Sequence, residues 1–169
     1  DVERVRLMSF AGDKTEAMEA ARSLLDRALE PPHEIELWWC LAHSALAIGE
    51  VATAWESIEH ALRLWAGLTE DTERQELGGR LFWLHGYMLR ERGQFDLARE
   101  ASERALEFTQ ATQDLHTRAL AHRTIGLIGY DRYTIDEASE HLFESLRLLR
   151  EVDDRKTSVE VLVDLASIS

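Results

Sequence analysis

The chain has 169 residues, and its 45% apolar content is enough to build either one compact domain or four short repeats. The 32 acidic side chains outnumber the 19 of Lys and Arg, so the net charge of −13 disfavours binding to nucleic acid or to an anionic membrane surface. Cys40 is the only cysteine, which excludes an intrachain disulfide and a thiolate zinc cluster and favours a reduced, cytoplasmic protein.

No segment of the sequence is expected to insert into a membrane. The longest nearly apolar stretch, residues 37–49, is shorter than a bilayer span and contains His43 and Ser44. The first ten residues carry acidic side chains where a signal peptide has a basic head and an apolar run.

Four turn positions divide the chain into repeats. They are Gly12, Gly49, Gly93 and Tyr133, which lie 37, 44 and 40 residues apart. On both sides of each turn the apolar residues recur with a period near 3.6, which predicts a helix before the turn (helix A) and a helix after it (helix B). The predicted repeats cover, approximately, residues 1–31, 32–70, 71–113 and 114–153, followed by the first helix of a fifth repeat at 156–169.

Local signals mark the helix boundaries of the first half. Asp13 and Glu16 fit a capping box loosely, and Pro31-Pro32 ends one helix and starts the next. We interpret residues 69–79 as a lengthened loop and a first helical turn. The Gly78-Gly79 pair is expected to make that end of the helix flexible.

Two further capping boxes are predicted in the second half. Thr134 with Glu137, and Thr157 with Glu160, have the required spacing of three residues. No alternating apolar pattern or hairpin turn is present, so the predicted fold class is all-α.

Small residues recur at fixed distances from the turns. Two helices that cross about 8–10 Å apart leave no room for a bulky side chain at the contact, so small residues there predict close crossings of helix A and helix B. A glycine inside a helix costs about 1 kcal/mol relative to alanine, so its repeated use indicates a steric requirement. We expect Ala98 to face the helix A before it and Ala105 the helix A after it. The small positions are Ala42, Gly86 and Gly126 in the A helices, and Ala54, Ala98, Ala138, Ala61, Ala105 and Ser145 in the B helices.

The combined pattern resembles the tetratricopeptide repeat (TPR). An aromatic residue in helix A, a small residue four later, a turn glycine and two small residues in helix B occur together at Phe82, Gly86, Gly93, Ala98 and Ala105. The resemblance covers nearly the whole chain. It implies a single array with the fold of an α-α superhelix, a solenoid of antiparallel helix pairs.

The repeats depart from the family pattern in the last full repeat and in their length. His122 replaces the aromatic residue of helix A, and Tyr133 replaces the turn glycine. The period near 40 exceeds the family's period of about 34 residues. Longer periods resemble the variant of MalT-like activators and of the sensory segments of bacterial histidine kinases and diguanylate cyclases.

Neither end of the sequence carries an obvious polar cap, which repeat arrays need to stay soluble. Val5 occupies the small position of the first repeat, which puts Asp1 inside a helix A, and Leu162 and Ala166 occupy the aromatic and small positions of the fifth. We therefore expect the chain to be a fragment of a longer protein, or to form a homodimer through its end helices.

The family resemblance implies a ligand-binding groove lined by the A helices. Its aromatic side chains and two arginines suit an extended peptide that carries an apolar anchor and a carboxylate, although the net acidity favours a basic or neutral partner overall. The alternative is that Trp39 and Trp83 pack between neighbouring A helices. The groove positions, counted back from each turn, are Trp39, His43, Trp83, Tyr87, Arg90, Arg123, Leu127 and Tyr130.

No catalytic, metal or cofactor site is predicted. The seven histidines are scattered without a His-x3-His pair, and His116 and His122 do not share a helix face well. No phosphate loop, nucleophile elbow or Cys-His arrangement is present.

The predicted function is that of a protein- or peptide-binding TPR scaffold without enzymatic activity, acting as the sensory or regulatory segment of a larger bacterial signalling protein. The alternative is a regulatory input or dimerisation region of a signalling enzyme, such as a diguanylate cyclase or histidine kinase, or of a MalT-like transcription activator. In that case the output domain lies outside this chain.

Overall fold

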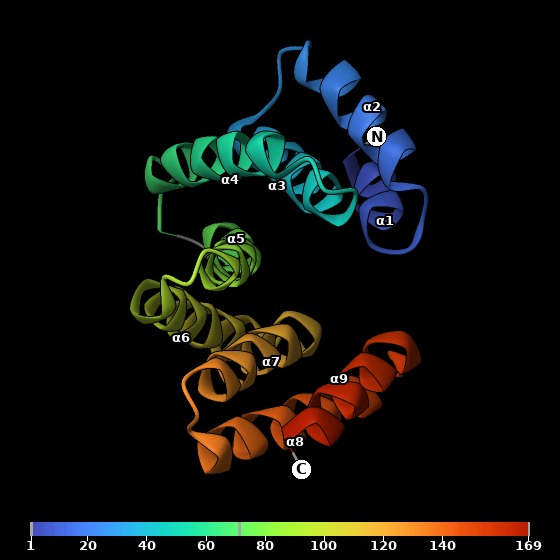
Figure 1. Cartoon of the computed structure of the whole chain (residues 1–169). Helices are drawn as coiled ribbons and strands as arrows, with labels where there is room; N and C mark the ends of the chain where they lie inside the picture. The colour runs from blue at the N-terminus through green and yellow to red at the C-terminus, as the bar shows by residue number, and fades with distance from the viewer. Residues whose placement is uncertain (1, 71, 169) are drawn as a thin grey trace. The chain divides into compact units, whose positions relative to one another are not determined.

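The computed structural model describes residues 2–70 and 72–168, and within them it contains nine helices and no strand (Figure 1). The predicted all-α class is confirmed. In chain order the helices are α1 (Val2–Ala11), α2 (Lys14–Leu25), α3 (Pro31–Ala47), α4 (Val51–Ala66), α5 (Thr72–Glu91), α6 (Phe95–Thr112), α7 (Leu115–Asp131), α8 (Ile135–Glu151) and α9 (Arg155–Ile168). The odd-numbered helices are the predicted A helices and the even-numbered ones the B helices. The predicted helical state of Asp1 and the repeat boundaries at residues 71 and 169 lie outside the described residues.

The chain divides into two compact modules within α5, with the boundary between Leu77 and Gly78. In the N-terminal module α2 contacts α1 and α3, α3 contacts α4, and α1 also contacts α3. In the C-terminal module α7 contacts both α6 and α8, and α9 contacts both α8 and α7. Each module is therefore a stack of antiparallel helix pairs in which A helices lie beside A helices.

The turns at Gly49, Gly93 and Tyr133 share one backbone conformation. Gly49 and Gly93 have φ angles of +84° and +72°, in the left-handed region that glycine enters without steric cost. The next residue donates its N–H to a carbonyl five residues back, as Gln94 does to Leu89 at 3.0 Å. Tyr133 takes the same position with a φ of +61°, and Thr134 donates to Gly129 at 2.8 Å. The repeat pattern of the sequence therefore predicts the positions of these three turns correctly.

Aspartates cap the helix starts better than the predicted threonines. Asp13 accepts hydrogen bonds from the backbone of Thr15 and Glu16 and caps α2, as predicted. Thr134 stands at the N-cap of α8, but its side chain makes no capping hydrogen bond. The predicted start of the last helix at Thr157 is wrong, because Asp154 accepts from the Thr157 N–H at 3.0 Å and α9 begins before it.

Residues 69–79 are more helical than predicted. Helix α5 already begins at Thr72, and Gly78 and Gly79 are buried inside it. Trp65 on α4 donates its indole N–H to the carbonyl oxygen of Arg74 at 2.7 Å, and the Arg74 guanidinium lies 4.1 Å from the centre of the Trp65 ring. These contacts hold the first turns of α5 against α4, which explains why the segment is not a loop.

The small residues of the A helices lie where helix B crosses closely. A Cβ atom on Gly86 would lie 2.6 Å from Ser102 Oγ and 3.1 Å from the Ala98 carbonyl oxygen, both on α6. On Gly126 it would lie 2.8 Å from Leu142 Cγ on α8. The predicted steric requirement is confirmed at both glycines.

In the fourth repeat Ser145 contacts the preceding helix A. It stands at the position of Ala105, for which we predicted a contact with the helix A that follows. Its hydroxyl instead donates to the carbonyl oxygen of Ala119 at 2.7 Å, on the preceding helix α7. A serine inside helix B needs an acceptor once it is buried, and the backbone of its own pair partner provides one.

We expect Gly126→Ala to destabilise the protein. Overpacking against Leu142 costs about 1–3 kcal/mol, which outweighs the gain of about 1 kcal/mol in helix propensity. Urea denaturation measures the loss. In a Leu142→Ala background the loss should shrink because the nearest clashing atoms are gone, and an unchanged loss would contradict the proposed clash.

Tyr133→Gly should stabilise the protein by about 0.5–1 kcal/mol, because a side chain in the left-handed region is strained. Tyr133 is 89% exposed, so its replacement removes little packing. Thermal denaturation measures the change. The reverse substitution, Gly93→Ala, has open space around the new methyl group and should lower stability through backbone strain alone. Equal stability of all three proteins would show that the turn conformation carries no strain.

Candidate functional site

Five of the predicted groove residues lie partly exposed on the A helices of the C-terminal module. Tyr87 and Arg90 stand on α5, and Arg123, Leu127 and Tyr130 stand on α7. Tyr130 is 40% exposed and the other four are half-buried. Together with the neighbouring polar residues of α9 they form the surface that we name the A-helix face.

Both arginines of the A-helix face are already paired with carboxylates of the next helix A. Arg90 Nε on α5 lies 2.7 Å from Asp131 Oδ2 on α7. Arg123 on α7 contacts two acids on α9, with Nε 2.7 Å from Asp164 Oδ2 and Nη1 2.5 Å from Glu160 Oε2. These ion pairs connect α5 to α7 and α7 to α9, so neither guanidinium is free for a ligand carboxylate.

The charges of the A-helix face are close enough to influence one another. Burial opposes the charge of Arg123, but its hydrogen bonds and ion pairs with Asp164 and Glu160 raise its pKa. Burial and the charge of Glu91 raise the pKa of Tyr87, while Arg90 and Arg123 act in the opposite direction. The Tyr87 phenol therefore stays neutral and lies within the electrostatic reach of all three A helices.

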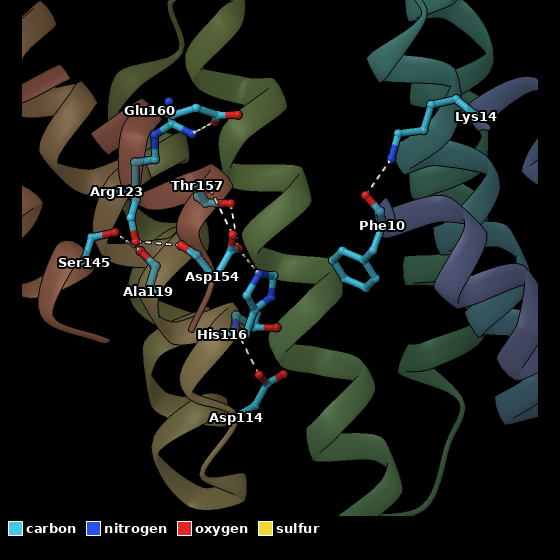
Figure 2. Close-up of polar contacts among 12 residues, drawn as sticks. Phe10, Lys14, Asp114, His116, Ala119, Arg123, Ser145, Asp154, Thr157 and Glu160 are labelled. Atoms are coloured by element: carbon cyan, nitrogen blue, oxygen red, sulfur yellow. Dashed lines mark hydrogen bonds and ion pairs between the residues drawn. The ribbon is translucent and has the colours of Figure 1, made fainter. Parts of the chain in front are cut away.

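The two groove residues predicted on α3 pack inside the N-terminal module. Trp39 is only 2% exposed, and its ring stacks on His43 with centroids 5.1 Å apart and lies 5.1 Å from Phe10 of α1. His43 Nδ1 lies 2.9 Å from the hydroxyl oxygen of the fully buried Ser9. Lys14 donates to the Phe10 carbonyl oxygen at 3.1 Å and fixes the end of α1 (Figure 2). Trp39 thus packs between A helices, as in the alternative interpretation.

Trp83 on α5 is 8% exposed, so its ring too offers little surface to a ligand. The A-helix face therefore includes neither tryptophan. Large aromatic rings contribute most when fully buried, which explains why the core takes them.

Polar contacts of α9 that sequence reasoning missed lie beside the A-helix face. His116 Nε2 on α7 lies 3.0 Å from Asp154 Oδ2, while the other oxygen of Asp154 caps α9 at Thr157 (Figure 2). Asp114 caps α7 in the same way, by accepting from the Thr117 N–H at 3.0 Å. The recurrence of Asp-x-x-Thr after 40 residues is the sequence signal that could have located both helix starts.

The aromatic position of helix A, four residues before the small residue, is occupied by Trp38, Phe82 and His122, and it contacts a ring of helix B in each of these three successive repeats. The centroid separations are 4.5 Å for Trp38 and His60, 5.8 Å for Phe82 and Phe108, and 5.1 Å for His122 and His141. His122 therefore fills an aromatic packing position.

The two imidazoles of the last ring pair share a hydrogen bond, with the Nδ1 atoms of His122 and His141 2.9 Å apart. Burial and the charge of His141 lower the pKa of His122 to about 4, and burial also lowers the pKa of His141. Both rings are neutral at pH 7, so that one nitrogen donates and the other accepts. Within the described part of the chain no three His, Cys, Asp or Glu side chains are grouped to hold a metal ion.

Solved structures share the fold, among them RapI and BtubC, whereas no protein-family model and no curated protein matches the sequence. The apo form of RapI aligns with 92% of this chain at a TM-score of 0.67 and 18% identity. BtubC (BKLC) from P. vanneervenii aligns with 99% at a TM-score of 0.65 and 19% identity. The fold is a TPR-like α-α superhelix. This chain spans 43% of the RapI chain and 65% of the BtubC chain, less than two thirds of either.

None of the helices described between residues 2 and 168 combines the length and the apolar character needed to cross a membrane.

The His122 and His141 pair should make stability depend on pH. In the unfolded chain a histidine titrates near 6.5, whereas His122 titrates near 4 in the fold. The unfolded state therefore binds more protons between these values, so stability should fall as the pH drops from about 6.5 to 4.

His122→Phe removes one of the two titrating rings and should reduce this pH slope by roughly half or more. Urea midpoints between pH 7 and 4.5 measure the slope. The reciprocal variant, Phe82→His, places a titratable ring in the equivalent slot and should steepen it. An unchanged slope in His122→Phe would show that other groups cause the loss of stability in acid.

Proposed function

We propose that the chain is a protein- or peptide-binding scaffold that performs no chemistry, and that the A-helix face of the C-terminal module is its contact surface. The observation that carries the proposal is the combination of partly exposed Tyr87, Leu127 and Tyr130 with side-chain charges that are held in place by ion pairs. Tyrosine and aliphatic anchors on a rigid helical surface provide contact area at little cost in conformational entropy.

The partner segment that this face fits best carries an apolar anchor and basic side chains. Four carboxylates, those of Glu91, Asp131, Glu160 and Asp164, contact only two guanidinium groups. A ligand carboxylate would have to displace one of these acids and leave it unpaired, which costs free energy in a half-buried site. A Lys or Arg side chain of a ligand can contact these carboxylates without displacing either guanidinium group. Charge complementarity therefore favours a basic peptide over the acidic peptide that the two arginines alone suggest.

In its natural setting we propose a cytoplasmic role as the sensory or regulatory interaction segment of a larger bacterial signalling protein. The long repeat period that resembles MalT-like and bacterial sensory arrays supports this setting. The second candidate is a regulatory or dimerisation region of a diguanylate cyclase, a histidine kinase or a MalT-like activator. Exposed apolar residues on α9, including Val159, Leu162 and Val163, favour an additional protein contact of that kind, a homodimer included.

Selection from a random twelve-residue peptide display library against the full chain tests the binding function. We expect the enriched peptides to share an aromatic or aliphatic anchor and at least one Lys or Arg. The double variant Tyr87→Ala and Tyr130→Ala should weaken their binding by roughly tenfold or more, because anchor residues carry most of the binding energy.

Tyr133→Ala is the matched control, since it removes an exposed tyrosine at the turn, outside the A-helix face. Circular dichroism verifies that each variant is folded. Asp164→Asn should reduce the preference for basic peptides. Failure to enrich any peptide, or binding that the double tyrosine variant leaves unchanged, would reject the A-helix face as the binding surface.

A further inference from the structure

Two ion-pair networks of the A-helix face are built alike. In each network an arginine contacts an aspartate of the next helix A through its Nε, at 2.7 Å, and a glutamate through its Nη1. Each network therefore contains one positive and two negative side chains, with a net charge of −1. The first network consists of Arg90, Asp131 and Glu91, and the second of Arg123, Asp164 and Glu160.

The glutamate of each network is the group that a ligand can reach. The side chains of Glu91 and Glu160 are 51% and 45% exposed, whereas those of Asp131 and Asp164 are 23% and 18% exposed. The aspartate thus fixes the arginine from within the face. The glutamate keeps solvent-exposed surface that a Lys or Arg side chain of a ligand can contact.

An apolar side chain lies between the two networks. On α7, Leu127 stands four residues after Arg123 and four residues before Asp131, so the three positions share one side of the helix. Leu127 is half-buried, and Tyr87 on α5 is influenced by charges of both networks. Along α7 the A-helix face therefore presents a negative network, an apolar side chain and a second negative network.

The spacing of the networks fits an extended peptide of five residues. Arg123 and Asp131 are eight residues apart, which corresponds to about 12 Å along the helix axis. In an extended peptide residues i and i+4 are about 13 Å apart, and the side chains of residues i, i+2 and i+4 point to the same side. Basic side chains at i and i+4 can therefore reach one network each while the side chain at i+2 contacts Leu127.

We propose that the A-helix face recognises an extended segment with basic residues at i and i+4 and an aromatic or large aliphatic residue at i+2. This inference rests on the proposed peptide-binding function and adds the spacing of the charges of the ligand. The net charge of −13 attracts any basic peptide, whatever the spacing of its charges. Dependence of the affinity on spacing therefore distinguishes recognition by the two networks from general attraction.

Three fluorescent peptides of equal length and composition serve as probes. Each contains two Lys and one Phe among Ser and Gly residues. The first contains Lys-Ser-Phe-Ser-Lys, the second contains Ser-Lys-Phe-Lys-Ser, and the third has each Lys four residues from Phe. In anisotropy titrations with the full chain, the first peptide should bind at least roughly fivefold more tightly than the other two.

Glu91→Gln and Glu160→Gln should each weaken binding of the first peptide by roughly two- to fivefold, as expected for the loss of a partly exposed ion pair. The chain that carries both substitutions should bind the three peptides equally. Glu140→Gln is the matched control, because it removes an exposed acid on α8, outside the A-helix face. It should bind the first peptide as the unchanged chain does, and circular dichroism verifies the fold of every variant.

Equal affinity for the three peptides, or an affinity that Glu91→Gln and Glu160→Gln leave unchanged, overturns this inference. An equal loss in Glu140→Gln also overturns it, because the net charge of the chain would then account for the attraction. If the double variant Tyr87→Ala and Tyr130→Ala abolishes binding in these cases, only the charge spacing is wrong and the proposed function stands. Absence of binding by all three peptides and by the peptide library overturns both.

Discussion

The close crossing of helix A and helix B is the constraint on which the other contacts depend. At Gly86 and Gly126 the backbone of helix A approaches side chains and carbonyl oxygens of helix B so closely that a single added methyl group would clash. That close approach fixes how each helix of the pair is rotated about its own axis. Once the rotation is fixed, one side of helix A must face its own helix B and another must face the next helix A. The remaining side forms the A-helix face.

Ion pairs between successive helices of the same type affect the charge of the A-helix face more than they affect the stability of the fold. Arg90 and Arg123 reach acids on the next helix A, and Arg99 on α6 contacts Glu137 on α8 through two hydrogen bonds of 2.7 and 3.0 Å. Partly exposed pairs of this kind contribute roughly 0–1 kcal/mol each. Their larger effect is to occupy both guanidinium groups, so that the surface presents paired carboxylates beside the rings of Tyr87 and Tyr130.

The histidines of this chain show why residue type alone does not identify a site. His122 and His141 face each other at a position where other repeats pack aromatic rings, and burial keeps both neutral. His116 instead contacts the capping aspartate of α9, and His43 contacts the hydroxyl of Ser9 on α1. Each ring is engaged by a neighbour from another helix, which the spacing of histidines along the chain does not show.

Sequence patterns are sufficient to predict the helix pairs, the turns at Gly49, Gly93 and Tyr133 and the need for glycine at the crossings. These features follow from constraints within two helices that are adjacent in the chain, so periodicity and residue size suffice to find them. The start of α9 was predicted incorrectly because Asp154, three residues before the expected cap Thr157, is the better N-cap.

The accessibility of the groove residues and the charges that they present depend on contacts between helices that are distant in the sequence. Arg90 and Arg123 meet acids that lie 41 residues further along the chain, and Trp39 is covered by Phe10 from another helix pair. Such contacts depend on how one A helix is shifted and rotated against the next. No local pattern records that shift, because it is set jointly by all the side chains that fill the space between the two helices.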